Sequence, residues 1–363
     1  MKKLLGNLLV LGIGCLVALM LLEVFLRWAQ PIPSRIKGDQ IVLPHNRLYQ
    51  FANPGYAGLD SLIMHRKNAL GFRGPNVADA WDSSLTIIAV GGSTTECYLI
   101  SDGNDWPNLV GDKLRPNYAQ LWVNNAGLDG HSTFGHQLLL NDYIVPLKPD
   151  FVLFLLGANE VGRTDLDQYD KAQLKQNVPA WKRTLYHSEV VSLLLNIQRA
   201  AKADALDLTH QYLDLKTQEH RQTDTMRVMA QIQSDSSTLQ SYRGRIQRLI
   251  DSCRINDIEP ILITQPSLLG MGIDPDTQVD LATVAWQESN GAAYWWRLEA
   301  YNEVLRETAS QNDVLCIDLA NLLPKRSAYF YDIIHYTNAG SEAVSKIIAE
   351  KLAAYLASQA QSL

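Results

Sequence analysis

Residues 85–95, with the sequence LTIIAVGGSTT, decide the fold class of this chain. The run Leu85–Val90 is mostly apolar, and glycines at positions 91 and 92 end it. A short apolar run bounded by glycine is typical of a strand that is buried on both faces, as in a parallel sheet. Ser93 follows this strand directly, at a position where a nucleophile can be held accessible to substrate.

Four more short apolar runs follow, and longer stretches with helical spacing separate them. This alternation predicts an α/β fold with a parallel five-stranded sheet covered by helices on both faces. With 363 residues, 47% of them hydrophobic, the chain can bury a large core. The expected strands after the first are Gln120–Asn124, Phe151–Leu156, Pro260–Thr264 and Val314–Asp318.

The first 28 residues predict a transmembrane signal anchor. Lys2 and Lys3 precede an apolar run from Leu4 to Leu22, and about 20 apolar residues span a bilayer core. The residues after the run form a poor cleavage site, although a cleaved signal peptide is the alternative. The positive N-terminus favours a cytoplasmic start. We therefore expect a single-pass membrane anchor with the body of the protein extracytoplasmic, in the periplasm.

The remaining chain divides into a lead-in and one large domain. Residues 29–80 are rich in proline and glycine and predict an irregular lead-in or linker, and residues 81–363 hold the strand pattern. Within that domain, residues 163–235 lack strand signals and predict a helical insertion. A second insertion, at about 268–300, contains Trp286, Trp295 and Trp296.

Charge and cysteine content narrow the classes of partner. The net charge of −6 gives no basic footprint for nucleic acid, so we expect small molecules, glycans or lipids. Cys97, Cys253 and Cys316 are the cysteines outside the N-terminal helix, and this odd number at unpaired spacing predicts no disulfide framework.

Polar segments follow the ends of the strands, and the carboxyl ends of parallel strands meet at one edge of a sheet, where ligands bind. Ser93 needs a base within hydrogen-bond reach, and His335, with Asp332 to orient it, can supply one. An oxyanion needs fixed donors, which the backbone N–H groups of Ser93 and Gly130 and the side-chain amide of Asn159 can provide. The polar segments are Gly91-Gly92-Ser93, Asn125 to Gly130, Gly157-Ala158-Asn159 and Asp332 to His335.

In this order, the four segments resemble the sequence blocks of the SGNH (GDSL-type) hydrolases over roughly residues 85–355. The resemblance implies a three-layer αβα, flavodoxin-like fold with sheet order 2-1-3-4-5. It also implies Ser93 as nucleophile, His335 as base, Asp332 as orienter, and an oxyanion hole of Ser93, Gly130 and Asn159. Ester hydrolysis or acyl transfer on lipids and glycans, with no metal or other cofactor, is the chemistry that the family performs.

The chain departs from the usual family pattern at two positions. Gly92 stands where the first block usually has aspartate, and Glu160 stands where the third block usually ends in aspartate. The GGSTT form is similar to that of membrane-anchored bacterial members of the family. These departures bear on the subfamily and the substrate.

Competing motifs fit the sequence less well. Thr95 occupies the position where the GxSxG elbow of α/β-hydrolases requires glycine. His131 and His136 lack the spacing and the companion ligands of a zinc site. Arg73 can line the site, but a structural ion pair is the preferred interpretation, and packing is preferred for Cys97 and for the three tryptophans.

These observations predict a membrane-anchored serine esterase that cleaves an O-acyl ester, O-acetyl or lipid acyl, in the cell envelope through an acyl-Ser93 intermediate. One alternative is an O-acyltransferase that moves the acyl group to a hydroxyl of an envelope polysaccharide. A second alternative is a non-catalytic envelope-assembly protein on the same fold.

Overall fold

The computed structural model describes residues 2–29, 36–37, 40–77, 81–161, 178–205 and 210–360. The chain forms two compact units, one of residues 1–44 and 167–210 and the other of residues 45–166 and 211–363. Part of the expected 163–235 insertion, residues 163–177 and 206–209, lies outside the described residues.

The larger unit is built around one parallel five-stranded sheet. Its strands are β5 (Leu85–Gly91), β6 (Leu121–Asn125), β7 (Phe151–Leu156), β8 (Glu259–Thr264) and β11 (Cys316–Ile317), in the order β11-β8-β7-β5-β6. Every neighbouring pair is parallel. The predicted order 2-1-3-4-5 is therefore confirmed, and all five predicted strands form.

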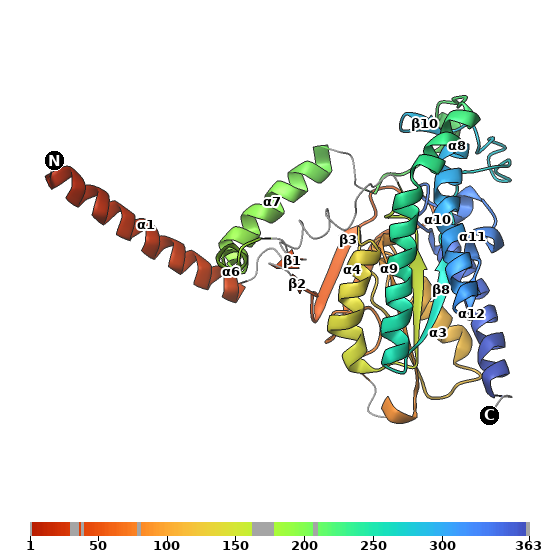
Figure 1. Cartoon of the computed structure of the whole chain (residues 1–363), viewed down its shortest axis with the longest axis horizontal. Helices are drawn as coiled ribbons and strands as arrows, with labels where there is room; N and C mark the ends of the chain where they lie inside the picture. The colour runs from red at the N-terminus through yellow and green to blue at the C-terminus, as the bar shows by residue number, and fades with distance from the viewer. Residues whose placement is uncertain are drawn as a thin grey trace. The chain divides into compact units, whose positions relative to one another are not determined.

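Helices cover both faces of this sheet and complete the three layers (Figure 1). The helices α3 (Trp106–Leu114) and α12 (Asn338–Ala360) pack together on one face. On the other face, α9 (Ser236–Ile255) packs between α4 (Thr133–Leu139) and α10 (Gly291–Gln311). Because helices cover both faces, nearly every residue of β5 and β7 is buried, which explains their almost continuous apolar sequences.

A hairpin precedes the sheet in the same unit. The strands β3 (Arg47–Ala52) and β4 (Leu62–Lys67) pair antiparallel over six residues each. Residues of β4 alternate strictly between exposed and buried, and the inward positions are Ile63, His65 and Lys67. The region expected to be an irregular lead-in thus contains an ordered hairpin, which belongs to the same unit as the five-stranded sheet.

The remaining elements of the larger unit are short or lie in the insertions. Within the expected helical insertion at 163–235, α8 (Thr225–Ser234) belongs to this unit. Further elements are α2 (Ser93–Glu96), α11 (Leu319–Leu322), β9 (Ala285–Trp286), β10 (Ser289–Asn290), the π-helix η2 (Leu140–Ile144) and the 3-10 turns η1 (Trp81–Ser83), η3 (Val145–Leu147), η4 (Leu215–Thr217) and η5 (Ser327–Tyr329).

The smaller unit contains α1 (Lys2–Ala29), the strand pair β1 (Ile36–Lys37) and β2 (Gln40–Ile41), and the helices α6 (Ala180–Tyr186) and α7 (Glu189–Ala205). By length and composition, α1 can cross a membrane over its 27 residues Lys3–Ala29. The Glu23 carboxylate on α1 accepts hydrogen bonds from the backbone N–H groups of Glu189 and Val190 at 3.0 and 3.1 Å. A carboxylate at this position caps the first turn of α7 and matches the positive end of its dipole.

Candidate active site

Ser93 lies just after the carboxyl end of β5, the strand between β7 and β6, as the first residue of the one-turn helix α2. Its preceding residue, Gly92, is the N-cap of that helix. Ser93 is 5% exposed. The strand-to-helix turn therefore holds this hydroxyl at the sheet edge, with its backbone N–H at a helix start.

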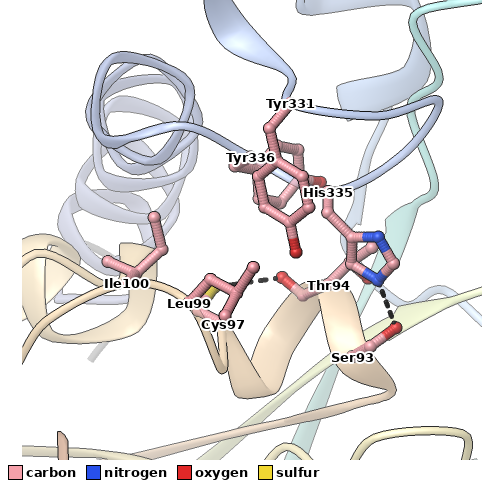
Figure 2. A pocket seen from close by; sticks show the side chains of 8 residues that line it. All are labelled: Ser93, Thr94, Cys97, Leu99, Ile100, Tyr331, His335 and Tyr336. Atoms are coloured by element: carbon pink, nitrogen blue, oxygen red, sulfur yellow. Dashed lines mark hydrogen bonds between the residues drawn. The ribbon is translucent and has the colours of Figure 1, made fainter. Parts of the chain in front are cut away.

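His335 and Asp332 lie next to Ser93, although 242 residues separate His335 from Ser93 in the chain. The Ser93 hydroxyl oxygen is 2.7 Å from His335 Nε2 (Figure 2). On the other side of the ring, His335 Nδ1 is 2.5 Å from Asp332 Oδ2. The three predicted residues thus form one continuous hydrogen-bonded chain. This is the arrangement that a serine nucleophile, a base and an orienting carboxylate require.

The loop that carries Asp332 and His335 is held by its own backbone. Asp332 Oδ1 accepts the N–H groups of Ile334 at 2.9 Å and His335 at 2.7 Å. Burial raises the pKa of the Asp332 carboxyl, but the charge of His335 and these hydrogen bonds outweigh it and lower the pKa below its ordinary value. The Tyr331 ring stacks on the His335 ring at 5.6 Å between centroids. Asp332 is therefore ionised at neutral pH, and the imidazole is fixed in orientation.

Asn159 lies directly beside the start of α2. Its Nδ2 donates to the His131 carbonyl at 2.9 Å. A Cβ atom at Gly92 would lie 2.3 Å from this same Nδ2, closer than non-bonded atoms approach. The glycine that replaces the usual aspartate of the first block is therefore the residue that leaves room for the Asn159 amide.

The loop that carries Gly130 runs along α2. The Leu128 N–H donates to the Gly91 carbonyl at 3.0 Å, and the Asp129 N–H donates to Glu96 Oε2 at 2.6 Å. Gly130 itself is exposed. The structure thus brings the Gly130 loop and Asn159 to the same helix start as Ser93.

Arg73 is a structural residue, in agreement with the preferred interpretation of the sequence. Its guanidinium is fully buried and donates to the carbonyls of Glu96, Cys97 and Ile100 at 2.7, 2.7 and 2.8 Å. It also lies 3.5 Å from the buried carboxylate of Asp105. Arg73 therefore holds the backbone carbonyls at the carboxyl end of α2, and it is not among the residues that line the cavity beside Ser93.

Two buried ion pairs near the site were not predicted. Glu160, the other departure from the family pattern, pairs with Arg245 of α9 at 3.1 Å and accepts the Thr133 N–H at 2.7 Å. Lys67 of β4 pairs with Glu96 of α2 at 3.1 Å. In each pair the partners are far apart in sequence, so no local pattern signalled them.

A small cavity of about 10 Å³ opens beside Ser93 (Figure 2). Its walls are mostly apolar, and its lining residues are Ser93, Thr94, Cys97, Leu99, Ile100, Tyr331, His335 and Tyr336. Burial raises the pKa of the Cys97 thiol, so Cys97 is a wall residue rather than a nucleophile. Trp286, Trp295 and Trp296 are not among the lining residues.

The sequence matches a family model over residues 89–343, and that model describes the GDSL-like lipase/acylhydrolase family. Among curated proteins, a sequence search found no match. Solved structures with a similar fold include a metagenomic α/β hydrolase from Lake Arreo, Spain (13% identity, TM-score 0.42, covering 75% of this chain and 96% of that one). Another is a putative lipolytic protein of the G-D-S-L family from Desulfitobacterium hafniense (13% identity, TM-score 0.41, covering 74% of this chain and 99% of that one). A third is an acetylxylan esterase from Geobacillus stearothermophilus (15% identity, TM-score 0.43, covering 74% of this chain and 94% of that one).

The family match covers most of the chain and includes Ser93, Gly130, Asn159, Asp332 and His335. It agrees with the parallel sheet order and with the position of Ser93 at the carboxyl end of β5. The chain belongs to the GDSL-like lipase/acylhydrolase family and is an SGNH-type esterase or acyl hydrolase.

Proposed function

We propose that this protein is a membrane-anchored serine esterase that cleaves an O-acyl ester of the cell envelope through an acyl-Ser93 intermediate. The observation that carries the proposal is the hydrogen-bonded chain from Ser93 through His335 to Asp332. A serine hydroxyl with a base and a buried carboxylate in this order is activated for attack on an ester carbonyl.

In the first step, the Ser93 oxygen bonds to the ester carbonyl carbon while its proton moves to His335 Nε2. The carbonyl electron pair moves onto oxygen, and the oxyanion is stabilised by the N–H groups of Ser93 and Gly130 and by the Asn159 amide. Asp332 stabilises the imidazolium through the 2.5 Å contact to Nδ1. The tetrahedral intermediate then collapses, and the alcohol oxygen leaves with the proton from His335.

In the second step, a water molecule takes the place of the alcohol. His335 accepts a proton from this water, and the water oxygen attacks the carbonyl carbon of acyl-Ser93. Collapse of the second tetrahedral intermediate breaks the bond to the Ser93 oxygen, which recovers its proton from His335. The products are a free carboxylic acid and the regenerated serine.

The cavity beside Ser93 favours a short acyl group. A volume of about 10 Å³ is about the size that one water molecule occupies. The mostly apolar walls suit the methyl group of an acetyl ester, whereas a longer chain would have to displace Leu99, Ile100 or Tyr331. O-acetyl esters are therefore the substrates that we propose first.

The helix α1 supports the proposed location of the enzyme. A helix of this length and composition is suited to anchor the chain in a bilayer, and the lysines at its start favour a cytoplasmic N-terminus. We propose that the catalytic domain is extracytoplasmic, where the esters of envelope glycans and lipids are found.

Hydrolysis of p-nitrophenyl acetate, butyrate and octanoate by the full-length protein tests this function. We expect turnover to fall from acetate to octanoate, to be lost in Ser93→Ala, and to persist in the control Ser252→Ala on α9. No turnover of any of the three esters, or equal turnover by Ser93→Ala, would contradict the proposal.

The acyltransferase alternative differs only in the acceptor, because a sugar hydroxyl replaces water in the second step. Adding a glycan acceptor to the acetyl ester assay and following the acetyl group by mass spectrometry separates the two reactions. Release of free acetate supports the esterase, and acetylated glycan supports the transferase.

A further inference from the structure

Lys67 is a buried cation outside the family-matched residues. It is the last residue of β4, its side chain is 1% exposed, and its ammonium nitrogen lies 3.1 Å from Glu96 Oε1. The Glu96 side chain is 6% exposed. Lysine and glutamate are rarely buried to this degree unless they are paired, and removing one partner leaves a costly unpaired charge.

Glu96 also contacts the loop of the expected oxyanion hole. Its second oxygen, Oε2, accepts the N–H of Asp129 at 2.6 Å, and Asp129 directly precedes Gly130. The loop approaches α2 so closely that a Cβ atom at Gly127 would lie 2.3 Å from the Glu96 nitrogen. The position of the Gly130 N–H is therefore coupled to the Glu96 carboxylate.

The helix that carries Glu96 is a single turn, too short to be stable by itself. Its carbonyls are held from outside: Arg73 donates to those of Glu96 and Cys97, and the Asn125 side-chain amide donates to that of Thr95 at 2.6 Å. Ser93 and Glu96 are the two ends of this clamped turn. The helix α2 therefore carries the proposed nucleophile, Ser93, at one end and contacts the Gly130 loop through Glu96 at the other.

We propose that Lys67 is a positioning residue of the esterase site, acting through Glu96 to hold the Gly130 loop at the distance from Ser93 that oxyanion binding requires. The inference rests on the proposed function. It assigns part of the active-site geometry to the hairpin that precedes the family-matched region. Without Lys67, the buried carboxylate of Glu96 would take up a proton or turn towards water, and its hydrogen bond to the loop would change.

The test compares Lys67→Met with Lys351→Met, which removes an exposed lysine from α12. We expect kcat for p-nitrophenyl acetate to fall by up to about 100-fold in Lys67→Met with little change in KM, because a displacement of about 1 Å in an active site has effects of this size. Lys351→Met should match the wild type. Affinity for phenylboronic acid, whose serine adduct places an oxygen in the oxyanion site, should fall together with kcat.

The variant Glu96→Gln and the double variant Lys67→Met/Glu96→Gln test the route through Glu96. A glutamine oxygen can still accept the Asp129 N–H, and the double variant has no unpaired buried charge. We therefore expect the double variant to be more active than Lys67→Met alone. If Lys67→Met folds poorly, the double variant can still be measured and compared with Glu96→Gln.

Three results would overturn the inference. The first is an active wild type with Lys67→Met equal to Lys351→Met. The second is a loss of thermal stability in Lys67→Met with unchanged kcat and boronate affinity in the folded fraction. The third is additive losses in the double variant. With any of these three results, the proposed esterase function still stands. A wild-type protein with neither turnover nor boronate binding would contradict both the proposed function and the role of Lys67.

Discussion

In the proposed mechanism, Ser93 lies between a base side, formed by Asp332 and His335, and an oxyanion side, formed by Gly130 and Asn159. These two sides are built in different ways. On the base side, Asp332 and His335 are three residues apart, and the hydrogen bonds that orient them come from the same short loop. On the oxyanion side, Gly130 and Asn159 belong to different loops, and their surroundings depend on contacts with distant elements. The geometry of the base side therefore depends on one short loop, whereas the geometry of the oxyanion side depends on contacts between segments that are far apart in sequence.

This difference has a consequence for mutation. A change on the base side acts through hydrogen bonds within one short loop, so we expect a large effect on activity and only a small effect on the free energy of unfolding. A change on the oxyanion side alters geometry through long-range contacts, so it affects activity and stability together. Variants on the two sides should separate these effects.

The largest effect is expected on the base side, from Asp332→Asn. The amide cannot stabilise the imidazolium and favours the wrong ring tautomer, so kcat should fall by about 10,000-fold, as in other serine triads. Ester hydrolysis measured beside Asp251→Asn, an exposed carboxylate of α9, checks this. A loss below about 10-fold would show that Asp332 does not orient the base.

A smaller loss is expected on the oxyanion side from Asn159→Ala. Removing one oxyanion donor costs about 100- to 1,000-fold in kcat, and KM should change little because the donor acts on the transition state. Asn141→Ala, on η2, is the matched control. A rise in KM with unchanged kcat would instead assign Asn159 to substrate binding.

Arg245→Met tests the long-range support of the oxyanion side. It leaves Glu160 buried without its partner, and breaking a buried ion pair of this kind costs about 3–5 kcal/mol in the free energy of unfolding. Denaturant unfolding should show this loss, with a loss of kcat smaller than that of Asn159→Ala. Unchanged stability would contradict the structural role of the Glu160–Arg245 pair.

The smallest effect concerns the pH dependence of stability. Because the folded-state pKa of Asp332 is lowered, its contribution is present above the unfolded-state pKa of about 3.9 and is lost as pH falls through the folded-state pKa. The difference in free energy of unfolding between wild type and Asp332→Asn should therefore shrink below about pH 4. A difference that stays constant from pH 7 to pH 3 would show that Asp332 is not held ionised by its partners.

The same contrast explains what could be predicted from the sequence. The continuous apolar runs of β5 and β7 and the short Asp332–His335 spacing are local patterns. The runs predicted the sheet, and the spacing predicted a pair that the structure places beside Ser93. The hairpin β3–β4 was missed because His65 and Lys67 fill inward positions of β4, so no alternation of apolar and polar residues marks it. The burial of Lys67 depends on Glu96, and that of Glu160 on Arg245, and such pairs exist only in the folded chain.

Intact mass spectrometry of the full-length protein during turnover of p-nitrophenyl acetate tests the central claim most directly. The account predicts a transient acetyl adduct on Ser93 that is absent in Ser93→Ala and present in Ser252→Ala. Steady turnover with no adduct in the wild type under rapid quenching, or an adduct that persists in Ser93→Ala, would contradict it.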